Sequence, residues 1–186
     1  ESKAVCQKFI SDFNGSDPIV APSASCVGFV KNYYSRLFDN SSLHHEVQEM
    51  KLRIFEFSSF LCHQIGVTQF GARLSGLATY HDSCAGLREC GIKEEPRKLL
   101  KNVGGLELVE MNETETCCGF GGTFAVKYEN ISMAMAEQKV ENALATKANY
   151  LISTDLSCLM QLNGYIQQKG YSIKPLHLAD VLASGW

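Results

Sequence analysis

The stretch Leu151-Ile-Ser-Thr-Asp-Leu-Ser-Cys158 indicates how this chain folds. Its apolar first residues predict a short buried strand, the small polar residues that follow predict a loop, and a helical pattern then continues to Gly170. A similar stretch, Ile19-Val-Ala-Pro-Ser-Ala-Ser-Cys26, occurs near the start of the chain. Both stretches therefore place a serine–cysteine pair directly after a strand, at the beginning of a helix.

Strands and helices alternate along the rest of the chain as well. Besides the strands at 18–22 and 150–153, apolar runs predict strands at 76–81, 106–109 and 173–178. Amphipathic patterns predict helices at 4–13, 26–38, 43–66, 94–103 and 123–147, where 43–66 allows a break near 51–53 and 123–147 allows two pieces. This alternation predicts an α/β fold, with a mainly parallel sheet flanked by helices.

The two similar stretches lie at matching places in two longer units. Upstream, residues 5–9 align with residues 136–140, and downstream, residues 54–57 align with residues 175–178. We therefore expect two copies of one unit, the first within residues 1–70 and the second within residues 71–186. The first copy lacks a counterpart to the cysteines at 84, 117 and 118, so we expect a fragment, or the ordered part, of a longer protein. Chance similarity between short strand–loop–helix units is the alternative.

The chain contains 8 cysteines, and their positions are more informative than their number. They lie at positions 6, 26, 62, 84, 90, 117, 118 and 158, and no two of them form a Cys-x-x-Cys pair. Zinc fingers and thioredoxin-like sites need such pairs, so both are disfavoured. Cysteines 26, 84, 117, 118 and 158 each follow a predicted strand. In parallel sheets, ligands bind at the carboxyl ends of strands, which makes this edge the expected site.

Composition excludes several classes of function. The 186 residues include 17 Lys+Arg and 20 Asp+Glu, for a net charge of -3, which gives no electrostatic support for nucleic-acid binding. No apolar run approaches the length of about 18 residues that a membrane span needs. The first residues have no pattern of a secretory signal, so we expect a cytoplasmic protein.

The cysteine spacing resembles that of the cysteine-rich CCG domain. Here 32 residues separate Cys84 from Cys117, Cys118 is followed by a glycine, and 39 residues separate Cys118 from Cys158. This family includes the B-type polypeptide of heterodisulfide reductase, the glycolate-oxidase iron–sulfur subunit and the A-type subunit of bacterial lactate-utilisation complexes. The lactate-utilisation type is the most similar, through Tyr-His-Asp-Ser-Cys84, Cys-Cys-Gly-Phe-Gly-Gly-Thr-Phe124, Asp-Leu-Ser-Cys158-Leu-Met and Leu-His-Leu-Ala-Asp-Val-Leu182.

The resemblance implies a set of site residues. Cys84, Cys117, Cys118 and Cys158 would hold a four-iron type of iron–sulfur cluster, because such clusters are bound by thiolates. Cys26, in Pro-Ser-Ala-Ser-Cys26, resembles the end of a first module and would be the remnant of a first site. Residues 1–70 would then be the C-terminal part of that module, and residues 71–186 a complete second one.

One position departs from the family pattern. The family ends with Cys-x-x-Cys, and this chain has Asp155 where the first of these cysteines stands. The five-thiolate site of a noncubane cluster therefore cannot form unaided. An ordinary four-iron four-sulfur cluster, or a cluster with Asp155 as an oxygen ligand, remains as an alternative. Asp155 is also a good N-cap for the helix that carries Cys158, and we favour that interpretation.

The glycines after the cysteine pair fit the same site. Gly119, Gly121 and Gly122 let the backbone approach a cluster closely and donate N–H groups to its sulfurs. A dinucleotide-binding loop is disfavoured, because the third position of that fingerprint would be Phe124. We expect His81 to be hydrogen-bonded locally rather than to form an acid–base pair with Asp82, since neighbours on a strand point to opposite faces.

By resemblance, the chain is an iron–sulfur oxidoreductase or electron-transfer subunit of a complex that oxidises L-lactate to pyruvate. Other iron–sulfur subunits would be its partners, and a small organic acid is an allowed substrate. The alternative is a zinc-binding or thiol-based module without redox iron. Zinc would take Cys84, Cys158 and one of the two adjacent cysteines, with an open position or Asp155 as the fourth ligand.

Overall fold

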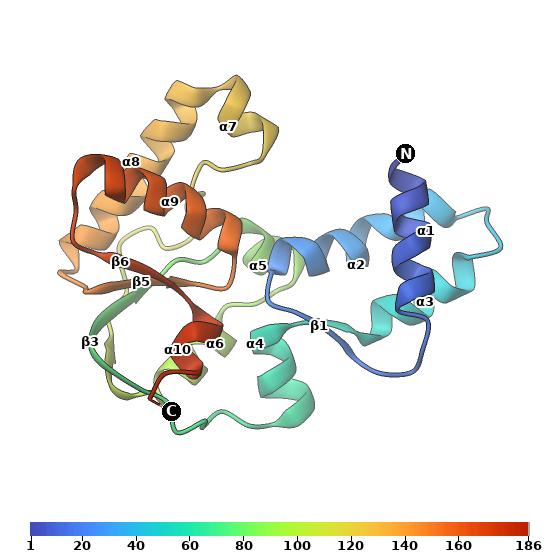
Figure 1. Ribbon diagram of the computed structural model, residues 1–186, viewed down its shortest axis with the longest axis horizontal. Helices are drawn as coiled ribbons and strands as arrows, with labels where there is room; N and C mark the ends of the chain where they lie inside the picture. Colours follow the sequence, from blue (N-terminus) through green and yellow to red (C-terminus); the bar gives the residue numbers. More distant parts are fainter. Residues whose placement is uncertain (186) are drawn as a thin grey trace.

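The computed structural model describes residues 1–185, which form two parallel sheets with helices packed around them (Figure 1). The strands are β1 (Ile19–Ala21), β2 (Ile54–Glu56), β3 (Arg73–Tyr80), β4 (Gly104–Leu108), β5 (Tyr150–Ser153) and β6 (Lys174–His177). The longer helices are α1 (Ser2–Asp12), α2 (Ala24–Phe38), α3 (His44–Arg53), α8 (Glu129–Ala145) and α9 (Leu156–Lys169). The short helices are α4 (Phe57–Ser59), η1 (Phe60–Ile65), α5 (Cys84–Glu89), α6 (Glu94–Leu100), α7 (Thr123–Lys127) and α10 (Leu178–Leu182). The predicted α/β class with parallel sheets is confirmed.

The larger sheet has the strand order β4-β3-β5-β6, and every pairing in it is parallel. Adjacent residues on β5 point to opposite faces of this sheet. Leu151 packs with Val140 and Leu162 of α8 and α9, whereas Ile152 packs with residues of α6 and α10 such as Leu99. Helices therefore cover both faces, as Figure 1 shows. The loops after β3, β4 and β5 all leave from the same edge.

The smaller sheet consists of β1 and β2, packed against α1, α2 and α3. Its register matches that of β5 and β6. Ile19 pairs with Ile54 as Leu151 pairs with Pro175, at the positions that the sequence alignment equates. This shared register supports the predicted repeat, although the repeat itself stays a prediction.

Most of the predicted elements are present, and one is wrong in part. The helix predicted over 43–66 is interrupted by β2 at Ile54, and the chain then turns into α4 and η1. Ile54 is only 2% exposed and pairs with Ile19, so a contact with a distant strand overrides the local helical pattern. The region 123–147 does form two helices, which are separated at Tyr128.

Helix α2, which packs on the smaller sheet, also packs closely on helix α5, which follows strand β3 of the larger sheet. Gly28 makes this approach necessary, since a Cβ atom there would lie 2.7 Å from the Cβ atom of Glu89. Asn32 donates a hydrogen bond of 3.2 Å to the Glu89 carbonyl, and the Cys90 thiol lies 3.4 Å from the Ala24 carbonyl. The two units therefore meet beside the loop that follows β3.

Replacing Gly28 by alanine should reduce the free energy of unfolding by about 1–3 kcal/mol, because α5 must move away from the added Cβ atom. Gly164 in α9 provides the matched control, since a Cβ atom there meets nothing within 4 Å. Gly164→Ala should stabilise the protein by about 0.5–1 kcal/mol through helix propensity alone. Urea denaturation of the reduced, metal-free protein measures both, and stabilisation by both variants would contradict the close packing of α2 on α5.

Candidate metal centre

The four cysteines predicted as ligands lie together at the carboxyl edge of the larger sheet. Cys84 begins α5 after β3, Cys117 and Cys118 lie in the long loop after β4, and Cys158 lies in the first turn of α9 after β5. Their thiols form a row of interacting groups, because Cys84 and Cys117, Cys117 and Cys118, and Cys118 and Cys158 lie close enough to shift the pKa of at least one member of each pair. Residues from three separate loops thus meet at one point.

The charge state of this row follows from how close the thiols are. Hydrogen bonds with Cys118 and Cys84 lower the pKa of Cys117, and the N–H of Gly119 donates to the same sulfur at 3.4 Å. The hydrogen bond with Cys117 raises the pKa of Cys84 and, together with a bond to Cys158, that of Cys118. Because adjacent thiolates repel each other, a negative charge on Cys117 makes ionisation of Cys84 and Cys118 more difficult. A bound metal would replace the protons and allow the others to ionise.

His81 joins the same cluster, which the sequence pattern did not indicate. One of its ring nitrogens and the sulfurs of Cys118 and Cys158 all lie within 4.8 Å of one another. The residue is 0% exposed, and neither ring nitrogen has a hydrogen-bond partner among the described residues. The expectation that the His81 ring is hydrogen-bonded locally is therefore wrong. Leaving a buried polar group unpaired costs about 1–3 kcal/mol, so the arrangement needs another explanation.

The imidazole of His81 is held in its neutral form. Burial, with a further effect of the nearby Lys139 ammonium, lowers the pKa of His81 to about 3. A neutral imidazole keeps a lone pair available on one ring nitrogen, which is the form that binds metals. The donors at this edge are thus thiols and one neutral imidazole, a set that suits zinc or iron.

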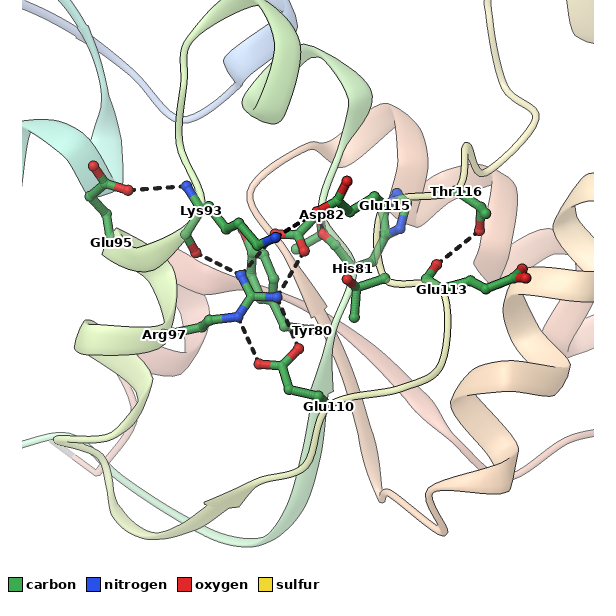
Figure 2. A network of polar contacts seen from close by, with 12 residues as sticks. Tyr80, His81, Asp82, Lys93, Glu95, Arg97, Glu110, Glu113, Glu115 and Thr116 are labelled. Atoms are coloured by element: carbon green, nitrogen blue, oxygen red, sulfur yellow. Dashed lines mark hydrogen bonds and ion pairs between the residues drawn. The ribbon is translucent and has the colours of Figure 1, made fainter.

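Asp82 points away from the cluster and binds Arg97. Figure 2 shows the Asp82 carboxylate directed at the Arg97 guanidinium, and the His81 ring turned to the other side. The guanidinium donates to the two Asp82 oxygens at 2.9 and 2.8 Å and to the two Glu110 oxygens at 2.7 and 2.9 Å. Both Asp82 oxygens therefore accept hydrogen bonds from Arg97. Asp82 does not form an acid–base pair with His81, as we expect from the sequence. The network joins the loop after β3 to α6 and to the loop after β4.

Lys139 is a buried cation near the thiols. Its side chain is 0% exposed, and its ammonium donates to the backbone carbonyls of Glu113 and Thr114 at 2.6 and 3.0 Å. These contacts hold the segment that leads into Cys117. Burial lowers the pKa of Lys139 to about 8, while the carboxylates and cysteines nearby favour its charged form.

Gly119 is required by a close approach of the backbone to α8. It adopts φ +86°, and a Cβ atom there would lie 2.5 Å from the Ser132 carbonyl oxygen. The Ser132 hydroxyl also donates to the Gly119 carbonyl at 2.8 Å. Gly121 and Gly122 follow with φ +53° and +60°, so the chain turns sharply after the cysteine pair. The Gly119 N–H reaches the Cys117 sulfur, and the expected approach of Gly121 and Gly122 to a cluster stays a prediction.

Asp155 is the N-cap of α9, as we favoured from the sequence. One of its oxygens accepts from the N–H and hydroxyl of Ser157, at 3.3 and 2.6 Å. The other oxygen accepts from the N–H of Ser25, the second residue of α2, at 3.2 Å. A single carboxylate thus caps two helices, one from each unit, and its charge complements the positive ends of both. Asp155 as an oxygen ligand stays an untested alternative.

The remaining cysteines lie apart from the thiol row. Cys26 is exposed in the first turn of α2, and nothing in the structure tests its role as the remnant of a first site. Cys6 is buried in the core of the smaller unit, Cys62 packs at the edge of the larger core, and Cys90 ends α5. These three thiols pack against the apolar cores. No helix among residues 1–185 is long and apolar enough to cross a membrane.

Comparison with known proteins identifies the family of the chain. The family model of the CCG cysteine-rich domain matches residues 78–163. Lactate utilization protein A 2 of Bacillus cereus strain Q1 is 40% identical over 186 residues, which is 100% of this chain and 77% of the relative. Lactate utilization protein A of Lysinibacillus sphaericus is 41% identical over 98% of this chain and 80% of the relative. The uncharacterized protein YkgE of Escherichia coli K12 is 42% identical over 92% of this chain and 72% of the relative.

Replacing Arg97 by methionine should lower the free energy of unfolding by about 3–5 kcal/mol, because the buried Asp82 carboxylate would lose its counter-charge. The side chains of Arg97 and Asp82 are only 9% and 2% exposed. Lys8→Met is the control, since the Lys8–Asp12 pair is 76% and 49% exposed and should contribute less than about 1 kcal/mol. Equal losses in urea denaturation would show that the Arg97 network does not hold the loops.

Proposed function

Because this chain belongs to the cysteine-rich CCG-domain family, with lactate utilization protein A among its relatives, we propose that it is an iron–sulfur electron-transfer subunit that acts in L-lactate oxidation to pyruvate. The observation that carries the proposal is the row of four thiols at three strand ends. Thiolates are the ligands that iron–sulfur clusters use, usually four for each cluster. When bound, such a cluster supplies one-electron transfer.

Cys84, Cys117, Cys118 and Cys158 would hold the cluster. Adjacent residues such as Cys117 and Cys118 do not easily place both sulfurs on one small tetrahedral ion, so they favour a centre with several irons. Gly119 directs its N–H at the Cys117 sulfur, which is a hydrogen bond of the type that tunes cluster potentials. Lys139 adds a positive charge beside a centre of several thiolates, which favours retention of the negative charge there.

The depth of the thiols indicates the side from which electrons would arrive. Cys118 and Cys158 are 2% and 5% exposed, whereas Cys84 and Cys117 are only partly buried. A partner would therefore approach over Cys84 and Cys117. We propose other iron–sulfur subunits of a lactate-utilisation complex as these partners, with a small organic acid as substrate of the complex and the cytoplasm as its location.

We also keep the proposed division of the chain. Residues 71–186 would form a complete CCG-type module, and residues 1–70 the C-terminal part of a first one. The common register of β1 with β2 and of β5 with β6 supports this division. Cys26 and Cys158 are each the third residue of the helix that follows the first strand of the pair.

Zinc binding is the second candidate function, and one observation favours it. His81, Cys118 and Cys158 offer three ligand atoms within 4.8 Å of one another, a set that matches the nitrogen and sulfur ligands of zinc sites. This set differs from the zinc ligands expected from the sequence, because it includes His81 and omits Cys84. A protein with zinc at this place would be a structural or thiol-based module.

Anaerobic reconstitution with iron and sulfide should yield about four iron and four acid-labile sulfide per chain, with visible absorption and an EPR signal on reduction. Metal and sulfide analysis of the anaerobically purified protein provides the measurement. A colourless protein with no iron after reconstitution would overturn the iron–sulfur proposal. One zinc per chain without sulfide would support the second candidate instead.

Replacing Cys117 by serine should abolish cluster assembly, because the central thiol of the row is lost. Cys90→Ser is the matched control, since Cys90 is a partly buried thiol of the same region that packs against the core of the smaller sheet and lies 3.4 Å from the Ala24 carbonyl. That variant should retain iron and sulfide at the wild-type ratio. Equal loss of iron in both variants would contradict the assignment of ligands.

A further inference from the structure

We propose that His81 is an additional protein ligand of this metal centre, through one imidazole nitrogen. This inference rests on the proposed function, because it requires that the four cysteines hold a metal. It goes further, because neither the cysteine spacing nor the matching family model assigns a role to this histidine. The centre would then have mixed sulfur and nitrogen ligation.

The first argument is the lack of any other partner for the ring. His81 is 0% exposed, and both of its nitrogens are buried without a hydrogen bond among residues 1–185. His177, at the end of β6, provides a comparison within the same molecule. Its Nε2 lies 2.9 Å from the Pro22 carbonyl oxygen, and its Nδ1 accepts from the N–H of Ala179 at 3.1 Å. This fold therefore provides partners for one buried histidine and leaves the other to a group that is not part of the chain.

The second argument is that the backbone position of His81 is fixed. The backbone N–H of His81 donates to the Ile152 carbonyl at 2.8 Å, and its carbonyl accepts from the Ser153 hydroxyl at 3.0 Å. The neighbouring Asp82 side chain is held on the opposite side by Arg97. These contacts fix the backbone of His81 and the side chain of Asp82, and a ring nitrogen of His81 lies within 4.8 Å of the Cys118 and Cys158 sulfurs.

The third argument is the depth of the donors. His81, Cys118 and Cys158 form a buried group in which every ligand atom lies within 4.8 Å of the others. Cys84 and Cys117 lie nearer the surface. The ligand set therefore extends inward beyond the four thiols, and His81 occupies its innermost part. Asp155 does not compete for this place, because both of its oxygens accept hydrogen bonds from helix N-termini.

Pulsed EPR of the reconstituted, reduced protein tests the proposal. Wild-type protein labelled with ¹⁵N-histidine should show a strong nitrogen coupling of the size of a direct iron–nitrogen bond, shifted from the unlabelled sample. His81→Gln should lose this coupling and release iron to a chelator about tenfold faster or more. His63→Gln is the control, since His63 is an exposed histidine that contacts Glu95, and it should keep the coupling.

The His81→Cys variant distinguishes loss of a ligand from a failure to fold. A thiolate at this position should retain iron and sulfide at the wild-type ratio while the histidine coupling disappears. A labelled wild-type protein with a full cluster and no histidine coupling would overturn the role of His81 and leave the iron–sulfur proposal intact. Retention of the coupling in His81→Gln would also overturn it.

The outcome with zinc separates the two proposals. If the protein binds zinc and no iron, the iron–sulfur proposal fails, and X-ray absorption at the zinc edge decides the role of His81. One nitrogen neighbour that disappears in His81→Cys supports ligation by His81, and sulfur neighbours alone overturn it. If the protein binds neither iron nor zinc through the four cysteines or His81, both proposals are overturned.

Discussion

The structure depends on one electrostatic constraint, which is that four thiols meet at the carboxyl edge of a parallel sheet. Neighbouring thiolates repel each other, and Cys118 and Cys158 are removed from water. The low pKa of Cys117 is therefore accompanied by raised pKa values at Cys84 and Cys118. The site is suited to a cation, and the fold must bring three loops together to form it.

Polar contacts outside the thiol row hold these loops. Arg97 joins Asp82, after β3, to Glu110, after β4. Lys139 holds the segment before the cysteine pair through two backbone carbonyls, and Asp155 holds the loop after β5 against the N-terminus of α2. Each contact pairs a buried or partly buried charge with a defined acceptor or donor, which gives it a definite direction. The thiols are thus positioned by residues that would not themselves touch a metal.

Local sequence patterns predicted the features that depend on residues close together in the sequence. Apolar periodicity located the strands of the larger sheet, and the strand-end rule placed Cys84, Cys117, Cys118 and Cys158 at one edge. The features that were missed depend on distant contacts. The local pattern predicts a helix over residues 54–56, whereas these residues pair with residues 19–21 as a strand, in agreement with their alignment to residues 175–177. The role of His81 was missed for the same reason, since its lack of a partner is visible only when the loops from β4 and β5 surround it.

The register of the two strand pairs bears on whether the units are equivalent. Ile19 and Ile54 are 35 residues apart, whereas their counterparts Leu151 and Pro175 are 24 apart, yet each pair is aligned in the same way. The two strand pairs share a register although the segments that connect their strands differ in length. Similar connecting segments therefore do not explain the shared register. The capping residues agree as well, because Glu56 and His177 end the aligned strands and each accepts from the first turn of the next helix. Since Asp155 caps both α2 and α9, the two units also share the charge that fixes the helices carrying Cys26 and Cys158.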